Sequence, residues 1–141
     1  SPHDKEYKWF GNVSTYEMEG LDKTLFTHMP LIITKSRKDR MILSKLYPNV
    51  ISSQNESEAA IPVENDTLFN QCKAKYCWFD SDEPGKTANR KLNHRGYKWI
   101  NVPNDLYEKF DLKDPGDVIS HFGWEKGKEI LLNEMKKKGI I

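Results

Sequence analysis

Four short apolar runs, separated by longer stretches of helical pattern, constrain the fold of this chain more than any other feature. They are "LIIT" at 31–34, "NVISS" at 49–53, "YCWFD" at 76–80 and "YKWINVP" at 97–103. Strands that alternate with helices of roughly 10 to 15 residues are typical of an α/β domain on a mainly parallel sheet. We therefore expect about four strands, mainly parallel, flanked by helices.

Helical patterns fill the intervals between these runs. A helix capped by Ser36 and ended by Pro48 follows the first run, and Asn65 or Asp66 caps a second before the third run. We expect "SDEPG" at 81–85 to be a turn before a polar helix that Gly96 ends. Residues 104–117 are expected to form a loop, and 118–139 a broken, Lys-rich helical segment.

The length of 141 residues fits one domain with a core of its own. We expect an N-terminal extension over 1–30 (a short hairpin or an extended lead-in), the main domain over 31–122 and a C-terminal helix over 123–141. The 22 basic and 21 acidic residues nearly cancel, so net charge does not indicate a polyanionic partner. Nucleic-acid affinity would have to come from local clusters.

The cysteines and the hydropathy narrow the class of protein. Cys72 and Cys77 have no second pair to complete a zinc site, which predicts two reduced thiols in the core of a cytoplasmic protein. No apolar run reaches the roughly 18 to 20 residues that span a bilayer, and no signal-peptide pattern opens the chain. We expect a cytoplasmic location and no membrane partner.

Acidic side chains follow the third apolar run directly. Asp80, Asp82 and Glu83 come where that strand ends, and hard carboxylate oxygens are the ligands that Mg²⁺ and Mn²⁺ prefer. In parallel sheets, chemistry gathers beyond the carboxyl ends of the strands, which places 35–39, 52–58 and 80–86 at one edge. Asp, Pro and Gly are also common in solvated turns, so both a metal site and an acidic turn remain open.

Three segments together resemble the Toprim domain of DnaG-type bacterial and phage primases. "YCWFDSDEPGKTANRKL" resembles the family's strand followed by D-x-D-x-x-G-x-x-A, and "LIITKSRKDRMIL" its strand followed by E-G-x-x-D. "KDPGDVI" at 113–119 resembles the K-D-P-D segment, so the likeness covers about 31–122. It implies a Toprim (Rossmann-like) fold and nucleotidyl transfer with Mg²⁺ or Mn²⁺ in primer synthesis. Single-stranded DNA and nucleotides are the implied partners, with a replicative helicase as a further candidate.

The resemblance also assigns roles to residues. It implies that Asp80 and Asp82 hold the metal, that Glu83 assists through water, and that Asp39 orients its loop or Lys35. Lys35 stands where the family has its Glu, and an ammonium group cannot bind Mg²⁺. The usual three-carboxylate site is therefore not present in its usual form. Two further acidic residues of the K-D-P-D-like segment are expected to be structural or to lie outside the metal shell: Asp114 and Asp117.

Three explanations for Lys35 remain open. Glu56 or Glu58, at the mouth of the second strand, supplies the missing carboxylate; or Lys35 holds a substrate phosphate; or Lys35 pairs with Asp80 or Asp82 in a metal-free relic. The first two preserve an enzyme. The third indicates a catalytically altered module that binds nucleic acid or a replication partner. A Toprim-type nuclease is a further alternative, which the K-D-P-D-like segment disfavours.

Basic and aromatic residues supply the remaining candidates. Cationic side chains at two helix starts would contact phosphates at the same edge, although a solvated face explains such residues equally well. Trp78 and Trp99 are expected in the core, whereas Trp9 and Trp124 either pack or stack on a base. The phosphate-binding candidates are Lys35, Arg37, Lys38, Lys86 and Arg90.

Overall fold

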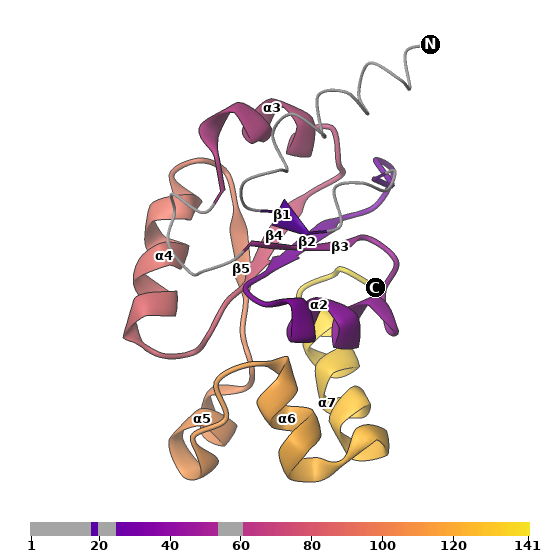
Figure 1. The fold of residues 1–141 in the computed structure, drawn as a ribbon, viewed down its shortest axis with the longest axis vertical. Helices are drawn as coiled ribbons and strands as arrows, with labels where there is room; N and C mark the ends of the chain where they lie inside the picture. The colour runs from indigo at the N-terminus through magenta and orange to yellow at the C-terminus, as the bar shows by residue number, and fades with distance from the viewer. Residues whose placement is uncertain (1–17, 20–24, 54–60) are drawn as a thin grey trace.

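A five-stranded sheet forms the centre of the molecule (Figure 1). The computed structural model describes residues 18–19, 25–53 and 61–141. The strand order is β1-β3-β2-β4-β5, in which β1 runs antiparallel to β3 and the other neighbours are parallel. The expectation of an α/β domain on a mainly parallel sheet is confirmed. The strands are β1 (Met18–Glu19), β2 (Leu31–Thr34), β3 (Val50–Ser53), β4 (Lys75–Trp78) and β5 (Lys98–Ile100).

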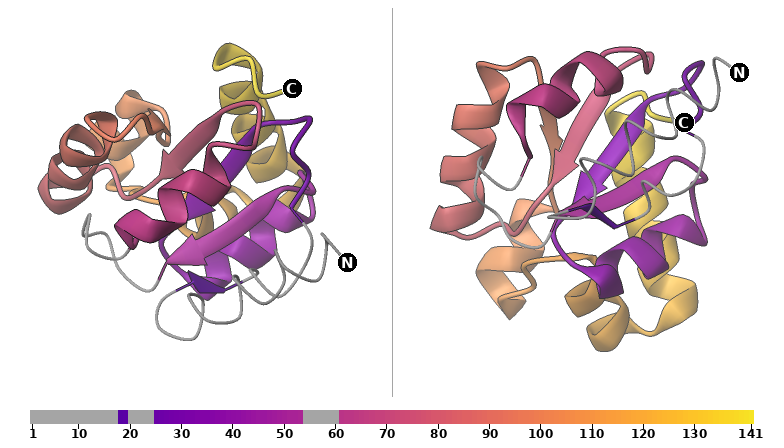
Figure 2. Two further views of the ribbon diagram at one scale, coloured as in Figure 1. Left: turned by 90° about the horizontal axis from the view of Figure 1, so that it is seen from above. Right: turned by 45° about the horizontal axis from the view of Figure 1, so that its top comes forward.

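Helices cover both faces of the sheet (Figure 2). On one face α3 and α4 contribute Phe69 and Leu92 to a core, and on the other α2 and α7 contribute Leu43 and Leu131. No helix in the described part of the chain is long and apolar enough to cross a membrane. The helices are α2 (Arg37–Ser44), the 3-10 turn η2 (Val63–Asn65), α3 (Asp66–Phe69), α4 (Glu83–Asn93), α5 (Asn104–Phe110), α6 (Pro115–Phe122) and α7 (Trp124–Lys137).

Strand register explains why the central strands are apolar throughout. Ile33 lies opposite Cys77 and faces the α3–α4 core, whereas the next pair along, Ile32 and Tyr76, faces the α2–α7 core. Alternate residues of a strand point to opposite faces, so a strand covered on both sides is apolar at every position. Cys77 and Cys72 are buried and in no disulfide, as expected.

Two helix starts differ from the sequence expectation. The turn predicted at 81–85 is the first turn of α4, because Asp82 caps it by accepting a hydrogen bond from the Gly85 N–H at 3.2 Å, and Pro84 fits there. The loop predicted over 104–117 instead contains α5 and the start of α6, which Asp114 caps. The extension over 1–30 lies mostly outside the described residues, and the domain boundaries remain predictions.

A buried polar network fixes α3 against the end of α4. Arg95 donates from Nη2 to Asp66 Oδ1 at 2.7 Å and from Nε to Oδ2 at 2.9 Å, and the Tyr97 hydroxyl donates to the same carboxylate. Burial alone would raise the pKa of Asp66, but the hydrogen bonds from Arg95 and Tyr97 outweigh it, so its pKa is lowered. The carboxylate is therefore held in its charged form between the two elements.

Asp66→Ala is expected to lower the free energy of unfolding by about 2 to 3 kcal/mol, because it removes a partly buried carboxylate that accepts hydrogen bonds from both Arg95 and Tyr97. Urea denaturation monitored by circular dichroism measures this loss. Glu64→Ala, at an exposed position of η2, is the matched control and should change the stability by less than about 0.5 kcal/mol. A loss no larger than that of the control would contradict a stabilising role for the network.

Candidate functional site

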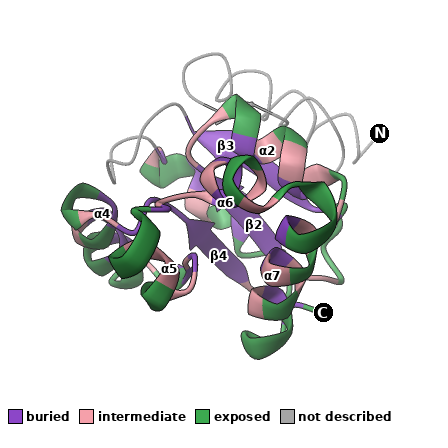
Figure 3. Ribbon diagram, turned by 90° about the horizontal axis from the view of Figure 1, so that it is seen from below, coloured by how far each residue is buried: buried purple, intermediate pink, exposed green. Residues whose placement is uncertain are grey.

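The candidate site lies where β2 and β4 end, beside the start of α6. Figure 3 views the molecule from the side on which α5 and α6 lie in Figure 1. The Thr34 hydroxyl, at the end of β2, donates to the Trp78 carbonyl at 2.9 Å, and the Asn101 amide donates to the Phe79 carbonyl at 3.1 Å. These bonds fix both strand ends, so the residues that follow, Lys35 and Asp80, leave the sheet side by side.

Lys35 and Asp80 form an ion pair. Lys35 Nζ lies 2.8 Å from Asp80 Oδ2, with side-chain exposures of 30% and 8%. Because the carboxylate is nearly buried, the ammonium group offsets a charge that water cannot fully solvate. The pair is the contact that the third explanation for Lys35 requires. The position beside Asp80 that a divalent cation would take carries a protein cation in this structure.

Asp39 joins α2 to α6 rather than to Lys35. Its side chain is 1% exposed, and its Oδ1 accepts a hydrogen bond from the Gly116 N–H at 2.8 Å, across 77 positions of sequence. Its Oδ2 is buried with no hydrogen-bond partner in the described part of the chain. Burial raises its pKa to about 6, with Asp114 and then Asp80 adding to the effect against the Gly116 and Ser36 hydrogen bonds. Asp39 is thus a carboxylate that needs a neutralising partner.

Asp114 brings a third carboxylate to the same place. It caps α6 by accepting from the Asp117 N–H at 2.8 Å, so the structural role expected for it is seen. The Lys113 carbonyl accepts from the Ser81 N–H at 3.0 Å, which ties this segment to the loop after β4. Burial raises the pKa of Asp114, and the charges of Asp117 and Asp80 raise it further. Asp followed by Pro is common where a helix begins, so Asp114 and Pro115 could have indicated the start of α6 from the sequence.

Two further predicted ligands lie at the start of α4, and one lies outside the described residues. The Asp82 carboxylate caps α4 through Gly85, and Glu83 is exposed in the first turn. Glu56 falls within 54–60, which the structure does not describe. Across the described ranges, no three His, Cys, Asp or Glu side chains form a group able to hold a metal ion.

The carboxylate oxygens at this edge are the kind of ligand that a divalent cation prefers, although among the described residues they do not converge into a metal-binding group. One buried oxygen of Asp39 has no hydrogen-bond partner among the described residues. Burial raises the pKa of both Asp39 and Asp114, and the charge of Asp80 adds to both shifts. Carboxylates crowded in this way are stabilised when a cation neutralises them. For Asp80 to take part, the Lys35 ammonium would have to leave its present position.

The cationic candidates other than Lys35 divide between two helices. Lys38 lies over Gly116, where a Cβ would come 2.2 Å from Lys38 Cε, the movable end of that side chain. Arg37 is exposed at the start of α2. On α4, Lys86 lies one turn from Asp82, and Arg90, which donates to Thr87 at 3.1 Å, lies about 12 Å along the axis from Asp82.

The expectation for Trp99 was wrong. Trp78 is 1% exposed in the core, as predicted, but Trp99 is 41% exposed. Strand β5 has three residues and forms one edge of the sheet, with the burial pattern exposed, exposed, buried. An edge strand has only one strand neighbour, so its aromatic residues are less completely covered than those of a central strand. The sequence of β5 fits an edge strand and a central strand equally well, so it did not reveal that Trp99 is exposed.

Comparisons with known proteins identify the fold. No family model and no curated protein matches the sequence. The crystal structure of the primase fragment of the bacteriophage T7 primase-helicase protein superposes with a TM-score of 0.59 at 16% identity, covering 78% of this chain and 45% of that one. A second similar structure is that of bacteriophage T7 lagging-strand DNA polymerase interacting with primase domains of two gp4 subunits, bound to an RNA/DNA hybrid and dTTP. Its TM-score is 0.58 at 17% sequence identity, and the match covers 77% of this chain and 56% of that one.

The chain thus spans about half of the structures that it matches. At these identities the similarity shows the fold alone, an α/β fold like that of the primase fragments in these two structures.

Proposed function

We propose that this chain is the Toprim part of a DnaG-type primase that joins nucleotides during primer synthesis for DNA replication. The observation that carries the proposal is that hydrogen bonds bring the segments of Asp39, Asp80 and Asp114 together at the carboxyl edge of the sheet: the Gly116 N–H donates to Asp39, and the Ser81 N–H donates to the Lys113 carbonyl. Ligand and metal sites of such folds lie at this edge. The structural similarity to phage primase fragments supports the same assignment.

In this proposal the carboxylates of Asp80 and Asp82 hold Mg²⁺ or Mn²⁺, with Glu83 assisting through water and Glu56 as a further ligand. A bound divalent ion would stabilise the charge that develops on the phosphoryl group. Asp39 is a positioning residue, because its hydrogen bond to Gly116 holds α6 and hence Asp114 in place. Basic residues before and within α2 and in α4 would hold the phosphate backbone: Lys35, Arg37, Lys38, Lys86 and Arg90.

The expected partners follow from the same assignment. They are nucleotides, a single-stranded DNA template and a replicative helicase, in a bacterial or phage-infected cytoplasm. The second solved structure is of a DNA polymerase interacting with primase domains and bound to an RNA/DNA hybrid and dTTP, which supports the choice.

One observation favours a second function. The Lys35–Asp80 ion pair already neutralises a carboxylate that the metal would use. If that pair is permanent, the chain is a catalytically altered module that binds nucleic acid or a replication partner without metal.

A direct measurement of Mn²⁺ binding distinguishes the primase from the catalytically altered module. Mn²⁺ titration followed by electron paramagnetic resonance is expected to show binding to the 141-residue chain, and Asp80→Asn with Asp82→Asn is expected to abolish it. Asn caps helices as well as Asp does, so α4 keeps its start in the double variant. Asp105→Asn, an exposed residue of α5, is the matched control and should bind Mn²⁺ like the wild type.

Absence of Mn²⁺ binding in the wild type would favour the altered module. Where Mn²⁺ binds, ribonucleotide incorporation on a single-stranded template supports the primase. Cleavage of that template without incorporation would instead indicate the nuclease.

A further inference from the structure

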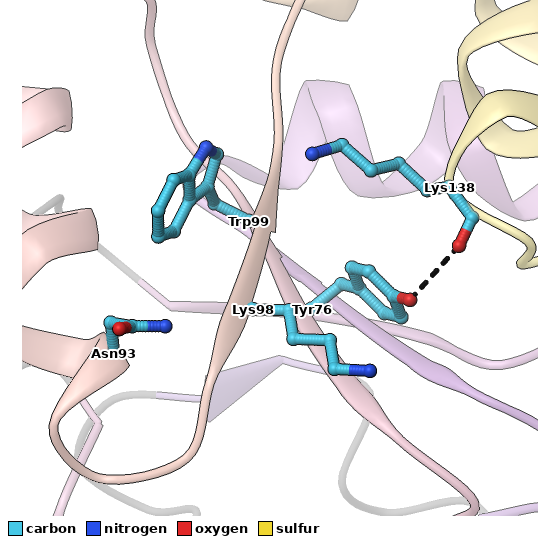
Figure 4. A pocket seen from close by; sticks show the side chains of 5 residues that line it. All are labelled: Tyr76, Asn93, Lys98, Trp99 and Lys138. Atoms are coloured by element: carbon cyan, nitrogen blue, oxygen red, sulfur yellow. Dashed lines mark hydrogen bonds between the residues drawn. The ribbon is translucent and has the colours of Figure 1, made fainter.

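The edge of β5 carries an aromatic and cationic surface outside the carboxylate site (Figure 4). Trp99 stands on this edge between the end of α4 and the end of α7, and it is among the most exposed large apolar side chains of the described residues. A hollow of about 270 Å³ lies beside the indole. Its lining consists of Tyr76, Asn93, Lys98, Trp99 and Lys138.

Lysines accompany the aromatic rings of this hollow. Lys138 Nζ lies 5.8 Å from the centroid of the Trp99 ring, and Lys98 Nζ lies 5.7 Å from that of Tyr76. The Tyr76 hydroxyl donates to the Lys138 carbonyl at 3.1 Å, which fixes the end of α7 beside β5. An exposed indole with one ammonium group over its ring and another over the neighbouring tyrosine can bind a flat ring together with the phosphate attached to it.

A second hollow continues the first toward the carboxylates. It measures about 240 Å³, shares Trp99 and Lys138 with the first, and extends to Lys86 and Ser81. Ser81 lies between Asp80 and Asp82, so the two hollows form one path from the β5 edge to the candidate site. The acidic side chain in this lining is Glu134, whose Oε2 is paired with Lys137 at 3.0 Å, and the pair offsets its charge.

We infer that this path, the Trp99 track, binds a single strand of nucleic acid. One base stacks on Trp99, and Lys98, Lys138 and Lys86 bind the adjoining phosphates. Each hollow is smaller than the roughly 300 to 1,000 Å³ of an enclosed small-molecule pocket, and two that adjoin suit an extended polymer better. The proposed function is needed only to identify the bound strand as a primase template. The binding itself requires no metal.

The test is fluorescence anisotropy of a short labelled oligothymidylate with the 141-residue chain, in EDTA and low salt. Trp99→Ala is expected to weaken binding about 5- to 150-fold, the loss of one stacked base, whereas Trp99→Tyr should retain most of the affinity. Phe26→Ala is the matched control, because Phe26 is 40% exposed, much like Trp99, and lines neither hollow. It should change binding by no more than about twofold.

A salt titration tests the lysines. Lys98→Gln with Lys138→Gln should reduce the slope of log affinity against log salt by about 1.4, since each phosphate contact on a single strand contributes roughly 0.7. Lys126→Gln, exposed on α7, should leave the slope unchanged. Equal slopes for the double variant and the wild type would overturn the role of the lysines.

Three results would overturn the inference: no binding by the wild type, unchanged binding by Trp99→Ala, or equal losses in Trp99→Ala and Phe26→Ala. A Trp99→Ala variant that breaks a dimer of the chain but still binds the oligonucleotide would assign the β5 edge to a protein contact instead. Because EDTA removes metal, this assay is independent of the Mn²⁺ titration. Either the Trp99 track or the metal site can therefore fail without the other.

Discussion

Lys35→Glu is expected to tighten Mn²⁺ binding by at least about tenfold and to lower the melting temperature of the metal-free chain. The substitution removes the ammonium group that lies 2.8 Å from Asp80 Oδ2 and places a carboxylate beside another that is 8% exposed. Two unit charges 4 Å apart interact by about 4 kcal/mol at an effective dielectric constant of about 20. If only a third of that energy adds to the binding free energy of Mn²⁺, the affinity for Mn²⁺ rises about tenfold.

Two variants separate the contributions in this experiment. Lys35→Gln removes the positive charge without adding a ligand, so it should tighten Mn²⁺ binding less than Lys35→Glu does. Lys73→Glu makes the same charge change at an exposed position two residues before β4, at the opposite end of the strand, and should leave Mn²⁺ affinity unchanged. Isothermal titration calorimetry gives the affinities, and thermal denaturation with and without Mn²⁺ gives the linked stability.

The opposite outcome has a definite meaning. If Lys35→Glu weakens Mn²⁺ binding, Lys35 supports the site, for example by fixing the Asp80 carboxylate in the orientation that binds metal. If neither the wild type nor any variant binds Mn²⁺, the Lys35–Asp80 pair is the permanent state of the site, and the metal-free module is the better proposal.

The sheet could be predicted because its central strands are buried on both faces. Ile32, Ile33 and Cys77 are fully buried, and a strand in that position shows an uninterrupted apolar run that sequence alone reveals. Trp99 has the same local pattern in an edge strand. Which strand becomes the edge depends on the order of pairing across the whole sheet, and a local pattern carries no information about that order.

The sequence indicated which segments meet at the candidate site, but it did not indicate the hydrogen bonds that join them. The edge rule for parallel sheets brings Lys35, Asp39 and Asp80 together from the sequence. The hydrogen bond between Asp39 and Gly116 spans 77 positions, and no local pattern predicts a contact of that range. The partner of Lys35 was left open among several carboxylates, because a long flexible side chain reaches any of them and its rotamer is set by packing.

Asp39→Asn is expected to make the metal-free chain more stable relative to the wild type as pH rises through the acidic range. The folded chain releases the Asp39 proton near pH 6, whereas the unfolded chain releases it near the ordinary value of 3.8. Between these values the folded state binds more protons, so the free energy of unfolding falls as pH increases. The wild type should therefore lose about 3 kcal/mol relative to Asp39→Asn between about pH 4 and pH 6.

The measurement is the difference in unfolding free energy between the two proteins, taken from urea titrations in EDTA at several pH values. The difference cancels the titration of carboxylates that do not interact with Asp39, such as Asp66, whereas Asp114, whose charge acts on Asp39, contributes to it. Asp105→Asn, an exposed control, should show no trend with pH. A flat difference for Asp39→Asn would mean that the buried carboxylate is neutralised in the folded chain, by Lys38 or by an ion. If the wild type instead loses stability relative to Asp39→Asn as pH rises, the fold keeps an uncompensated charge at this edge, as a site prepared for a cation does.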